Sequence, residues 1–251
     1  MVAKKKVLIT GAAGRIGTIL WNDWEKNKCY ELTLADRVGI EGSKSRVEVG
    51  DLRDSRFAKR ICEKQDVVVS LAYLRPENVG EENGGMTDIG MQMQLFEAAH
   101  QADAGKIIFA SSNHASGWNE MHDGPPLFST VDQINPDSWY GAMKCMAEAA
   151  GKYLVNVCDR RFVGIRIGTV NGESKPKCIR HCSTLLAPVD AAQLFGLAVD
   201  YEGRKKFLLV YGASDNVHEE RKGFLDLSIA KEVLGYKPKV NIMSFHDQCV
   251  E

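Results

Sequence analysis

The sequence predicts an α/β fold in which helices cover both faces of a doubly wound parallel sheet, followed by a small C-terminal lobe. Two observations carry this prediction. Short, continuous apolar runs alternate with longer segments of helical periodicity, which is typical of parallel strands buried on both faces. A glycine-rich turn, Gly11–Gly17, also stands between the first such run and the first helical segment. That arrangement is typical of the first turn of a Rossmann fold.

The expected strands are short runs rich in valine, isoleucine, leucine or phenylalanine: residues 6–10, 31–36, 46–49, 66–71, 105–110, 162–167 and 206–211. Helical periodicity marks the segments between and after them: residues 16–26, 55–64, 85–101, 138–158, 189–199 and 227–234. Right-handed crossovers between such strands produce the doubly wound sheet. We treat residues 1–251 as one domain, of which 1–168 form mainly the dinucleotide-binding core and 169–251 mainly a substrate-covering lobe.

Composition excludes several classes of partner. The formal net charge is −1, and no basic run extends beyond three residues such as Lys4–Lys6, so neither nucleic acid nor an anionic membrane is expected as a partner. No apolar run approaches the ~18–20 residues that span a bilayer, and the N-terminus lacks the apolar core of a signal peptide. Seven cysteines without a paired framework favour a reducing compartment, the cytoplasm. Cys178, His181 and Cys182 lack a second pair at zinc-like spacing, so no metal is expected.

Four features of the first half predict a dinucleotide site. The glycines of Gly11–Gly17 allow the backbone to approach a pyrophosphate, and the following helix directs free N–H groups toward it. Asp36 ends the second strand, where a carboxylate accepts hydrogen bonds from a ribose and repels a 2′-phosphate. NAD is therefore the expected cofactor, although Arg37 beside it could host that phosphate. Asp51, after the third strand, is expected near the adenine or as a helix cap.

Three residues of the middle region are candidates for the chemistry. Tyr140 and Lys144 are four positions apart in a helical segment and therefore share a face. A neighbouring ammonium and a positively charged nicotinamide both favour the phenolate form of tyrosine, lowering its pKa from about 10. Ser112 ends the fifth strand, at the sheet edge where ligands bind. An isolated Tyr-x-x-x-Lys pair is common on helix surfaces, and the serine distinguishes this one.

The order and spacing of these motifs resemble the extended short-chain dehydrogenase/reductase superfamily. The motifs are the glycine turn, Asp36, GDLRD, FASS and YGAMK, and the resemblance covers essentially the whole chain. It implies that Tyr140 is the acid/base, that Lys144 lowers its pKa and holds the cofactor ribose, and that Ser112 positions the reacting hydroxyl. The predicted cofactor-binding residues are Gly11, Gly14, Arg15, Ile16, Gly17, Asp36, Asp51, Leu52, Leu71, Ala72, Tyr140 and Lys144.

Within that superfamily, the phrase FASSNH, followed by YGAMK, RIGT and an R-x-x-S-T string, is similar to the uronate dehydrogenases. The resemblance implies NAD-dependent oxidation of the anomeric carbon of a hexuronic acid to a lactone. It also implies that Arg180 grips the carboxylate, although Arg180 could instead cap a helix or pair with a surface acid. His114 could likewise be a loop histidine without a ligand. The predicted substrate-binding residues are Arg75, Ser112, Asn113, His114, Thr169 and Arg180.

Departures from the family pattern leave other functions open. Asp88 stands where the family usually has an asparagine, and Arg75, Lys175 and Lys177 near the sugar could suit a phosphate. A dehydrogenase of a hexose phosphate or a neutral aldose is therefore an alternative, as is a sugar epimerase. A cofactor-binding sensor without catalysis is a further alternative, but such proteins tend to lose the tyrosine–lysine pair that is present here.

A homo-oligomer is expected from the family, whose members commonly pair two long helices, here residues 85–101 and 138–158. Four apolar positions are compatible with such a contact, or with packing on the sheet: Met91, Leu95, Met146 and Ala150.

Overall fold

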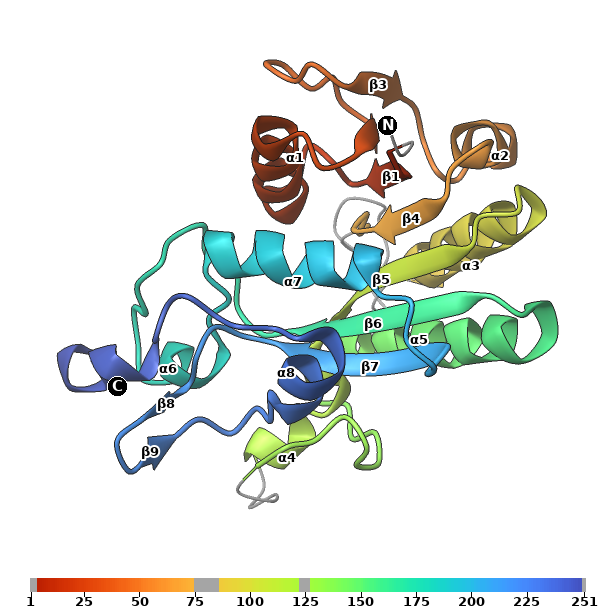
Figure 1. Cartoon of the computed structure of the whole chain (residues 1–251). Coiled ribbons are helices and arrows are strands. Elements are labelled where there is room, and N and C mark those ends of the chain that lie inside the picture. Colours follow the sequence, from red (N-terminus) through yellow and green to blue (C-terminus); the bar gives the residue numbers. More distant parts are fainter. Residues whose placement is uncertain (1–3, 75–85, 122–126, 250–251) are drawn as a thin grey trace.

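The computed structural model describes residues 4–74, 86–121 and 127–249. Its main sheet has seven parallel strands in the order β3-β2-β1-β4-β5-β6-β7 (Figure 1). The strands are β1 (Lys6–Thr10), β2 (Glu31–Asp36), β3 (Arg46–Val49), β4 (Val67–Ser70), β5 (Lys106–Ser112), β6 (Arg161–Ile167) and β7 (Phe207–Gly212). All seven expected strands form, with ends shifted by up to two residues. The prediction of a doubly wound parallel sheet is confirmed.

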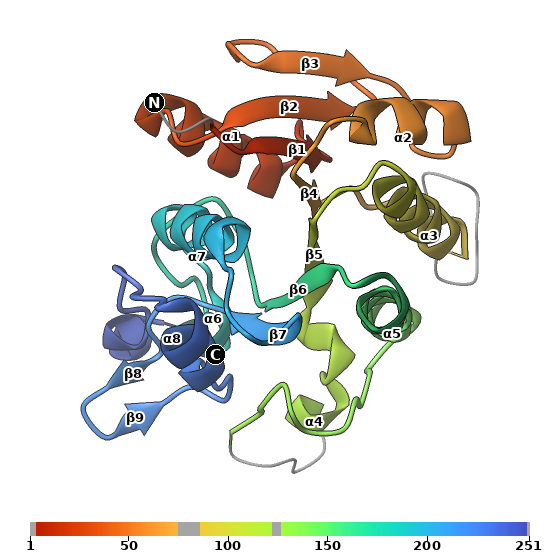
Figure 2. The same cartoon turned by 45° about the vertical axis from the view of Figure 1, so that its right-hand side comes forward.

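Helices cover both faces of this sheet, as Figure 2 shows. One face is covered by α1 (Arg15–Asn27), α7 (Pro188–Asp200) and α8 (Ser228–Leu234), and the other by α2 (Ser55–Cys62), α3 (Met86–Gln101) and α5 (Trp139–Cys158). Alternate residues of each strand face opposite layers: Val7 and Ile9 belong to the first core, and Leu8 to the second. This two-sided burial explains why the strands are continuous apolar runs.

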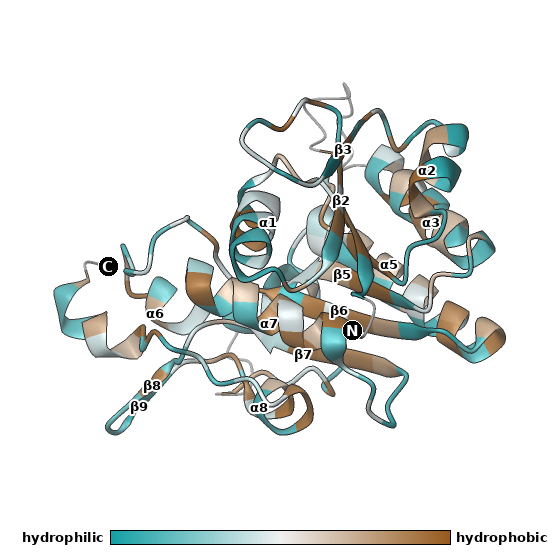
Figure 3. Ribbon diagram, turned by 45° about the horizontal axis from the view of Figure 1, so that its top comes forward, coloured by the Kyte–Doolittle hydropathy of each residue, from teal (hydrophilic) through white to brown (hydrophobic). Residues whose placement is uncertain are grey.

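Residues 169–251 divide between the sheet and a lobe. Within them, β7 completes the main sheet and α7 and α8 pack on one of its faces, whereas the remaining short elements lie beyond one end of it (Figure 1). Those elements are α6 (His181–Thr184), β8 (Val217–His218), β9 (Arg221–Lys222) and the 3-10 helix η3 (Met243–Gln248). Figure 3 shows hydrophobic colour along β6 and β7 and hydrophilic colour at the β8–β9 hairpin. The lobe is therefore small and largely polar at its tip.

The buried Asp190 fastens this lobe to the sheet. Its carboxylate accepts hydrogen bonds from the Ser214 hydroxyl at 2.6 Å and from the backbone N–H groups of Lys239 and Val240 at 2.6 and 3.2 Å. A carboxylate with several donors is satisfied without a cation. The chain after α8 is thus tied to the first turn of α7.

The strand order reverses between β1 and β4, which lie side by side while their following helices, α1 and α3, lie on opposite faces. Such a switch point opens a crevice at the carboxyl ends of the strands, where ligands bind in this class of sheet. The glycine turn follows β1, and Ser112 ends β5 next to β4. The fold therefore brings both halves of the predicted site to one edge.

Candidate active site

The glycine turn forms a cradle that a side chain would fill. Gly11 has a φ of +70°, and a Cβ there would lie 2.6 Å from the backbone nitrogen of Ala72. A Cβ on Gly17 would lie 2.6 Å from the carbonyl oxygen of Gly11. Helix α1 begins after Gly14 with no side-chain cap and no acidic residue in its first turn. The free N–H groups and the positive end of the helix dipole therefore fit a pyrophosphate.

Asp36 is held in place by the backbone. One carboxylate oxygen accepts from the N–H of Ala13 at 2.9 Å, and the other from the N–H of Arg37 at 2.7 Å. Asp36 and Arg37 both line the hollow beside Gly11. The oxygen bonded to Ala13 has one such partner and retains further acceptor capacity, so the position suits a ribose hydroxyl.

The pocket beyond Asp36 has apolar walls and an acidic residue whose carboxylate is already paired. Asp51 lines it, but both of its oxygens are bonded to the Arg53 guanidinium, with the shortest distance 2.6 Å. These hydrogen bonds lower the pKa of Asp51. The walls include Leu52, Phe57 and Met91, which suit a flat adenine ring. Phe57 and Met91 were not predicted, because in the sequence they are ordinary core positions of amphipathic helices.

Three adjacent hollows share Gly11 and together reach from Asp51 to Tyr140. They join the end of the cavity beside Asp51 to the end beside Tyr140. Every predicted cofactor-binding residue lines either the hollow beside Asp51 or the hollow beside Tyr140: Gly11, Gly14, Arg15, Ile16, Gly17, Asp36, Asp51, Leu52, Leu71, Ala72, Tyr140 and Lys144.

Tyr140 and Lys144 face the cavity from the first turns of α5, whose start Ser138 defines by accepting a hydrogen bond from Gly141 N–H at 3.2 Å. The Lys144 ammonium lies 5.4 Å from the centre of the Tyr140 ring and 4.8 Å from that of Phe109. Lys144 is 4% exposed. Burial lowers its pKa, while the charges of Asp88 and Glu148 oppose that shift.

The ionisation of Tyr140 is dominated by burial. Desolvation raises its pKa to about 12, and interaction with the Ser112 hydroxyl only partly offsets this. In the chain alone the phenol is therefore protonated at neutral pH. A positive charge brought into the cavity next to the phenol would lower this pKa.

Ser112 and His114 stand next to the phenol. Ser112 is the last residue of β5 and is buried, and its hydroxyl accepts from the backbone N–H of His114 at 3.2 Å. The His114 ring contacts the Tyr140 ring edge to face, with 5.6 Å between their centres. Its Nδ1 lies 2.6 Å from the Asp137 carboxylate. Asp137 therefore orients His114, a pairing that no pattern in the sequence indicates.

The other predicted sugar contacts converge on Arg180. With its amide nitrogen facing the Ile167 carbonyl (3.2 Å), Asn113 accepts a hydrogen bond from Arg180 Nη2 at 2.9 Å. Arg180 Nη1 donates to the Thr169 hydroxyl at 3.4 Å. Glu120, from α4 (Trp118–Met121), accepts from both Nε and Nη2 of the same guanidinium. Arg180 thus has an internal carboxylate partner, one of the alternatives left open by the sequence.

Arg75, the remaining predicted substrate contact, lies outside the described residues. The two lysines considered for a phosphate have other neighbours. Lys177 forms an ion pair with Glu173 at 2.8 Å, and the Lys175 ammonium lies 5.8 Å from the centre of the Phe245 ring. The structure therefore gives these lysines local roles on the surface.

Asp88 and the cysteine cluster also have defined places. The buried Asp88 accepts from the backbone N–H of Leu74 at 2.8 Å, so it holds the segment after β4. His181 Nδ1 accepts from the N–H of Lys177, and the Cys182 and Cys249 sulfurs lie 3.7 Å apart. Among the residues that the structure describes, no group of three or more His, Cys, Asp or Glu side chains is arranged to hold a metal.

A buried polar network supports the carboxyl end of β5. Glu148, one helical turn beyond Lys144, accepts from the Ser111 hydroxyl at 2.5 Å and pairs with both Nε and Nη2 of Arg166 at 3.0 and 2.8 Å. Arg166 stacks on the Tyr211 ring, whose hydroxyl lies 2.5 Å from that of Ser116. The network therefore ties both ends of the segment from Ser111 to Ser116 to the sheet and to α5.

The comparisons with known proteins agree with this geometry. A model of the NAD dependent epimerase/dehydratase family matches residues 7–199. A uronate dehydrogenase of Pseudomonas putida is 31% identical over 245 residues, covering 96% of this chain and 86% of that protein. An NAD-dependent glucose-6-phosphate dehydrogenase of Haloferax volcanii is 28% identical over 258 residues, covering 95% of each. A solved glucuronic acid dehydrogenase from Chromohalobacter salexigens superposes with a TM-score of 0.80 at 26% identity, covering 98% of this chain and 88% of that one.

The fold and the site together define an extended short-chain dehydrogenase/reductase. The chain belongs to the NAD dependent epimerase/dehydratase family. The predictions of the superfamily and of NAD as its cofactor are confirmed at this level. The relatives are named as sugar dehydrogenases, in agreement with the predicted class of enzyme.

Proposed function

We propose that this protein is an NAD-dependent dehydrogenase that oxidises the anomeric carbon of a hexuronic acid, glucuronate or galacturonate, to the aldarolactone. The observation that carries the proposal is the meeting of Tyr140, Lys144 and Ser112 at one end of the cavity whose other end holds the glycine cradle and Asp36. A glycine cradle alone would serve a sensor equally well. The three reacting groups beside it favour catalysis.

In this mechanism Tyr140 is the general base. Its phenolate takes the proton of the anomeric hydroxyl as the C1–O bond becomes a carbonyl, while Ser112 holds that hydroxyl in line with the ring. NAD, held at the glycine cradle and Asp36, would supply the acceptor for the hydride of C1. Lys144 contributes a buried positive charge next to the phenolate, which stabilises it relative to the phenol. Asn113 and His114 bind the sugar hydroxyls.

The variant Tyr140→Phe tests whether Tyr140 serves the chemistry while the glycine cradle serves NAD binding. We expect turnover to fall at least ~100-fold, the low end for loss of a general base, while NAD binding changes little because the cradle is intact. Absorbance at 340 nm with a panel of glucuronate, galacturonate, glucose, galactose and glucose 6-phosphate measures the first effect, and NADH fluorescence the second. Since burial holds the pKa of Tyr140 high, kcat/KM of the unsubstituted protein should rise with pH. Wild-type turnover in the variant would remove Tyr140 from the mechanism.

A neutral aldose is the second candidate substrate, and one observation favours it. Arg180, the residue expected to bind the uronate carboxylate, is already paired with Glu120. A sugar with a hydroxymethyl group in place of the carboxylate does not need the guanidinium as an ion-pair partner. The sugar panel separates the two candidates directly.

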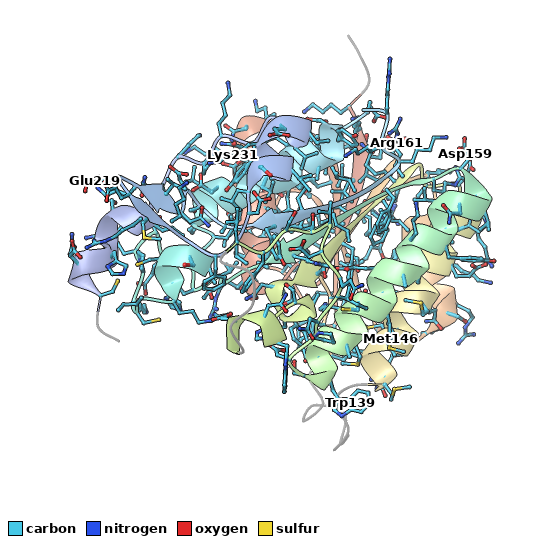
Figure 4. The ribbon with its side chains drawn as sticks, turned by 90° about the horizontal axis from the view of Figure 1, so that it is seen from below. Trp139, Met146, Asp159, Arg161, Glu219 and Lys231 are labelled. Atoms are coloured by element: carbon cyan, nitrogen blue, oxygen red, sulfur yellow. The ribbon has the colours of Figure 1, made fainter. Side chains whose placement is uncertain are left out.

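We further propose that the protein works in the cytoplasm as a homo-oligomer. Within the described residues no helix is long and apolar enough to cross a membrane, and scattered cysteines support a reducing compartment. Met91 and Leu95, predicted for a helix–helix contact, are buried in the monomer core. An exposed apolar row on α5 supports the contact instead, and Figure 4 labels its first two members: Trp139, Met146, Tyr153 and Val157. A monomeric mass by light scattering at micromolar concentration would refute this contact.

A further inference from the structure

The guanidinium of Arg180 has both of its bidentate edges occupied within the chain. Glu120 takes the edge formed by Nε and Nη2, with 3.0 Å between Nη2 and Oε2. On the other edge, Nη1 donates to Thr169 at 3.4 Å and Nη2 to Asn113 at 2.9 Å. Arginine has five N–H donors. These contacts use four of them, and a second carboxylate cannot dock in two parallel hydrogen bonds without displacing one of these partners.

The pair lies against the proposed sugar site. Asn113 follows Ser112 directly, and Thr169 follows Ile167 and Gly168, which line the cavity together with Tyr140. Both Arg180 and Glu120 are partly shielded from solvent, with side chains 38% and 22% exposed. Ionic contacts are screened less at such positions than on an open surface. A sugar that reaches Asn113 therefore meets a neutralised guanidinium.

We propose that Glu120 determines which sugars this site accepts, by acting as an internal carboxylate that competes with a uronate for Arg180. The inference rests on the proposed sugar dehydrogenase activity and concerns the choice between its two candidate substrates, a uronate and a neutral aldose. To pair with Arg180, a uronate must displace Glu120, and the displaced Glu120 carboxylate then lies close to the carboxylate of the sugar. The corresponding neutral sugar does not displace Glu120 and brings no second negative charge. Glu120 thus favours sugars without a carboxylate, and its removal favours uronates.

Glu120→Gln tests this with two substrates that differ only at C6, D-glucuronate and D-glucose. The variant keeps the size of the side chain and removes its charge. We expect the ratio of kcat/KM for glucuronate to that for glucose to rise about tenfold or more, the effect of roughly one charge-assisted hydrogen bond. The change should lie mainly in the KM for glucuronate, because the C6 group is remote from the reacting carbon. Glu120→Ala should shift the ratio in the same direction.

Two matched variants separate competition from a general charge effect. Glu173→Gln removes one negative charge from the neighbouring loop, where Glu173 pairs with Lys177, and should leave the ratio within about twofold, as expected for an exposed pair. In an Arg180→Ala background, Glu120→Gln should lose its effect, because the group for which the two carboxylates compete is gone. An equal shift from Glu173→Gln, or a full Glu120→Gln effect without Arg180, would overturn the inference.

The proposed function and the inference fail in different ways. If the unsubstituted protein oxidises sugars and Glu120→Gln leaves the ratio unchanged, only the inference is wrong. If no sugar in the panel is oxidised, the proposed function is wrong. Calorimetric titration of D-glucuronate into the NAD-loaded protein then decides the inference by itself, since tighter binding to Glu120→Gln than to the unsubstituted protein supports it and equal binding overturns it.

Discussion

The two ends of the cavity are built from different parts of the chain. At the cofactor end, the contacts come from backbone: the Gly11–Gly17 turn, the start of α1, and two N–H groups that hold Asp36. At the sugar end, they come from side chains that pair with one another, as in Arg180–Glu120 and His114–Asp137. We therefore expect an added side chain to weaken binding at the cofactor end. At the sugar end, we expect the removal of one charge to change which ligand binds.

The buried pair under the catalytic strand end is where we expect the largest effect. In Glu148→Gln, the Arg166 guanidinium, which is 1% exposed, keeps its charge and loses its partner. Breaking a buried ion pair in this way costs about 3–5 kcal/mol of unfolding free energy, measured by urea denaturation. The exposed Glu232 on α8 is the control, and Glu232→Gln should change the unfolding free energy by less than about 0.5 kcal/mol. Equal effects of the two substitutions would mean that the sugar end does not depend on this buried network.

Adding one methyl group at the cofactor end should have the next largest effect. Gly11→Ala places a Cβ 2.6 Å from the Ala72 nitrogen, at a φ of +70° that disfavours alanine. Overpacking and the left-handed backbone together cost about 2–4 kcal/mol, and NAD affinity should fall at least ~10-fold. Gly39→Ala meets no atom within 4 Å and should bind NADH normally in a fluorescence titration. Normal binding by Gly11→Ala as well would show that the cradle tolerates side chains.

The smallest expected effect concerns the carboxylate of Asp36 at the cofactor end. Asp36→Ala should narrow the preference for NAD over NADP roughly tenfold, because a negative charge next to a 2′-phosphate is removed. Arg37→Ala should widen the preference, since the lost charge is positive. The ratio of kcat/KM for the two cofactors measures both. If the unsubstituted protein uses NADP better, Arg37 rather than Asp36 governs this position.

The parts of the site predicted from sequence are those in which local pattern determines structure. The strands were predictable because burial on both faces demands continuous apolar runs. The cradle was predictable because only glycine allows such close approach, and the sharing of a face by Tyr140 and Lys144 because i and i+4 positions are neighbours in any helix. Ser112 followed from the position of its strand end. In each case the relevant residues are adjacent or one helical turn apart.

Only the tertiary structure decided which distant side chains meet. Glu120 and Arg180 are 60 residues apart, Glu148 and Arg166 are 18 apart, and no periodicity joins either pair. The tertiary structure also decided that Phe57 and Met91 line the adenine end. It likewise placed Met91 and Leu95 in the core of the monomer rather than against a partner helix. Which of several acids an arginine contacts depends on where loops place their side chains, and loop conformation is set by packing of the whole chain. The sequence by itself therefore determined the fold and the glycine cradle and predicted the proposed reacting groups, while the tertiary structure decided which charged side chains meet around Arg180.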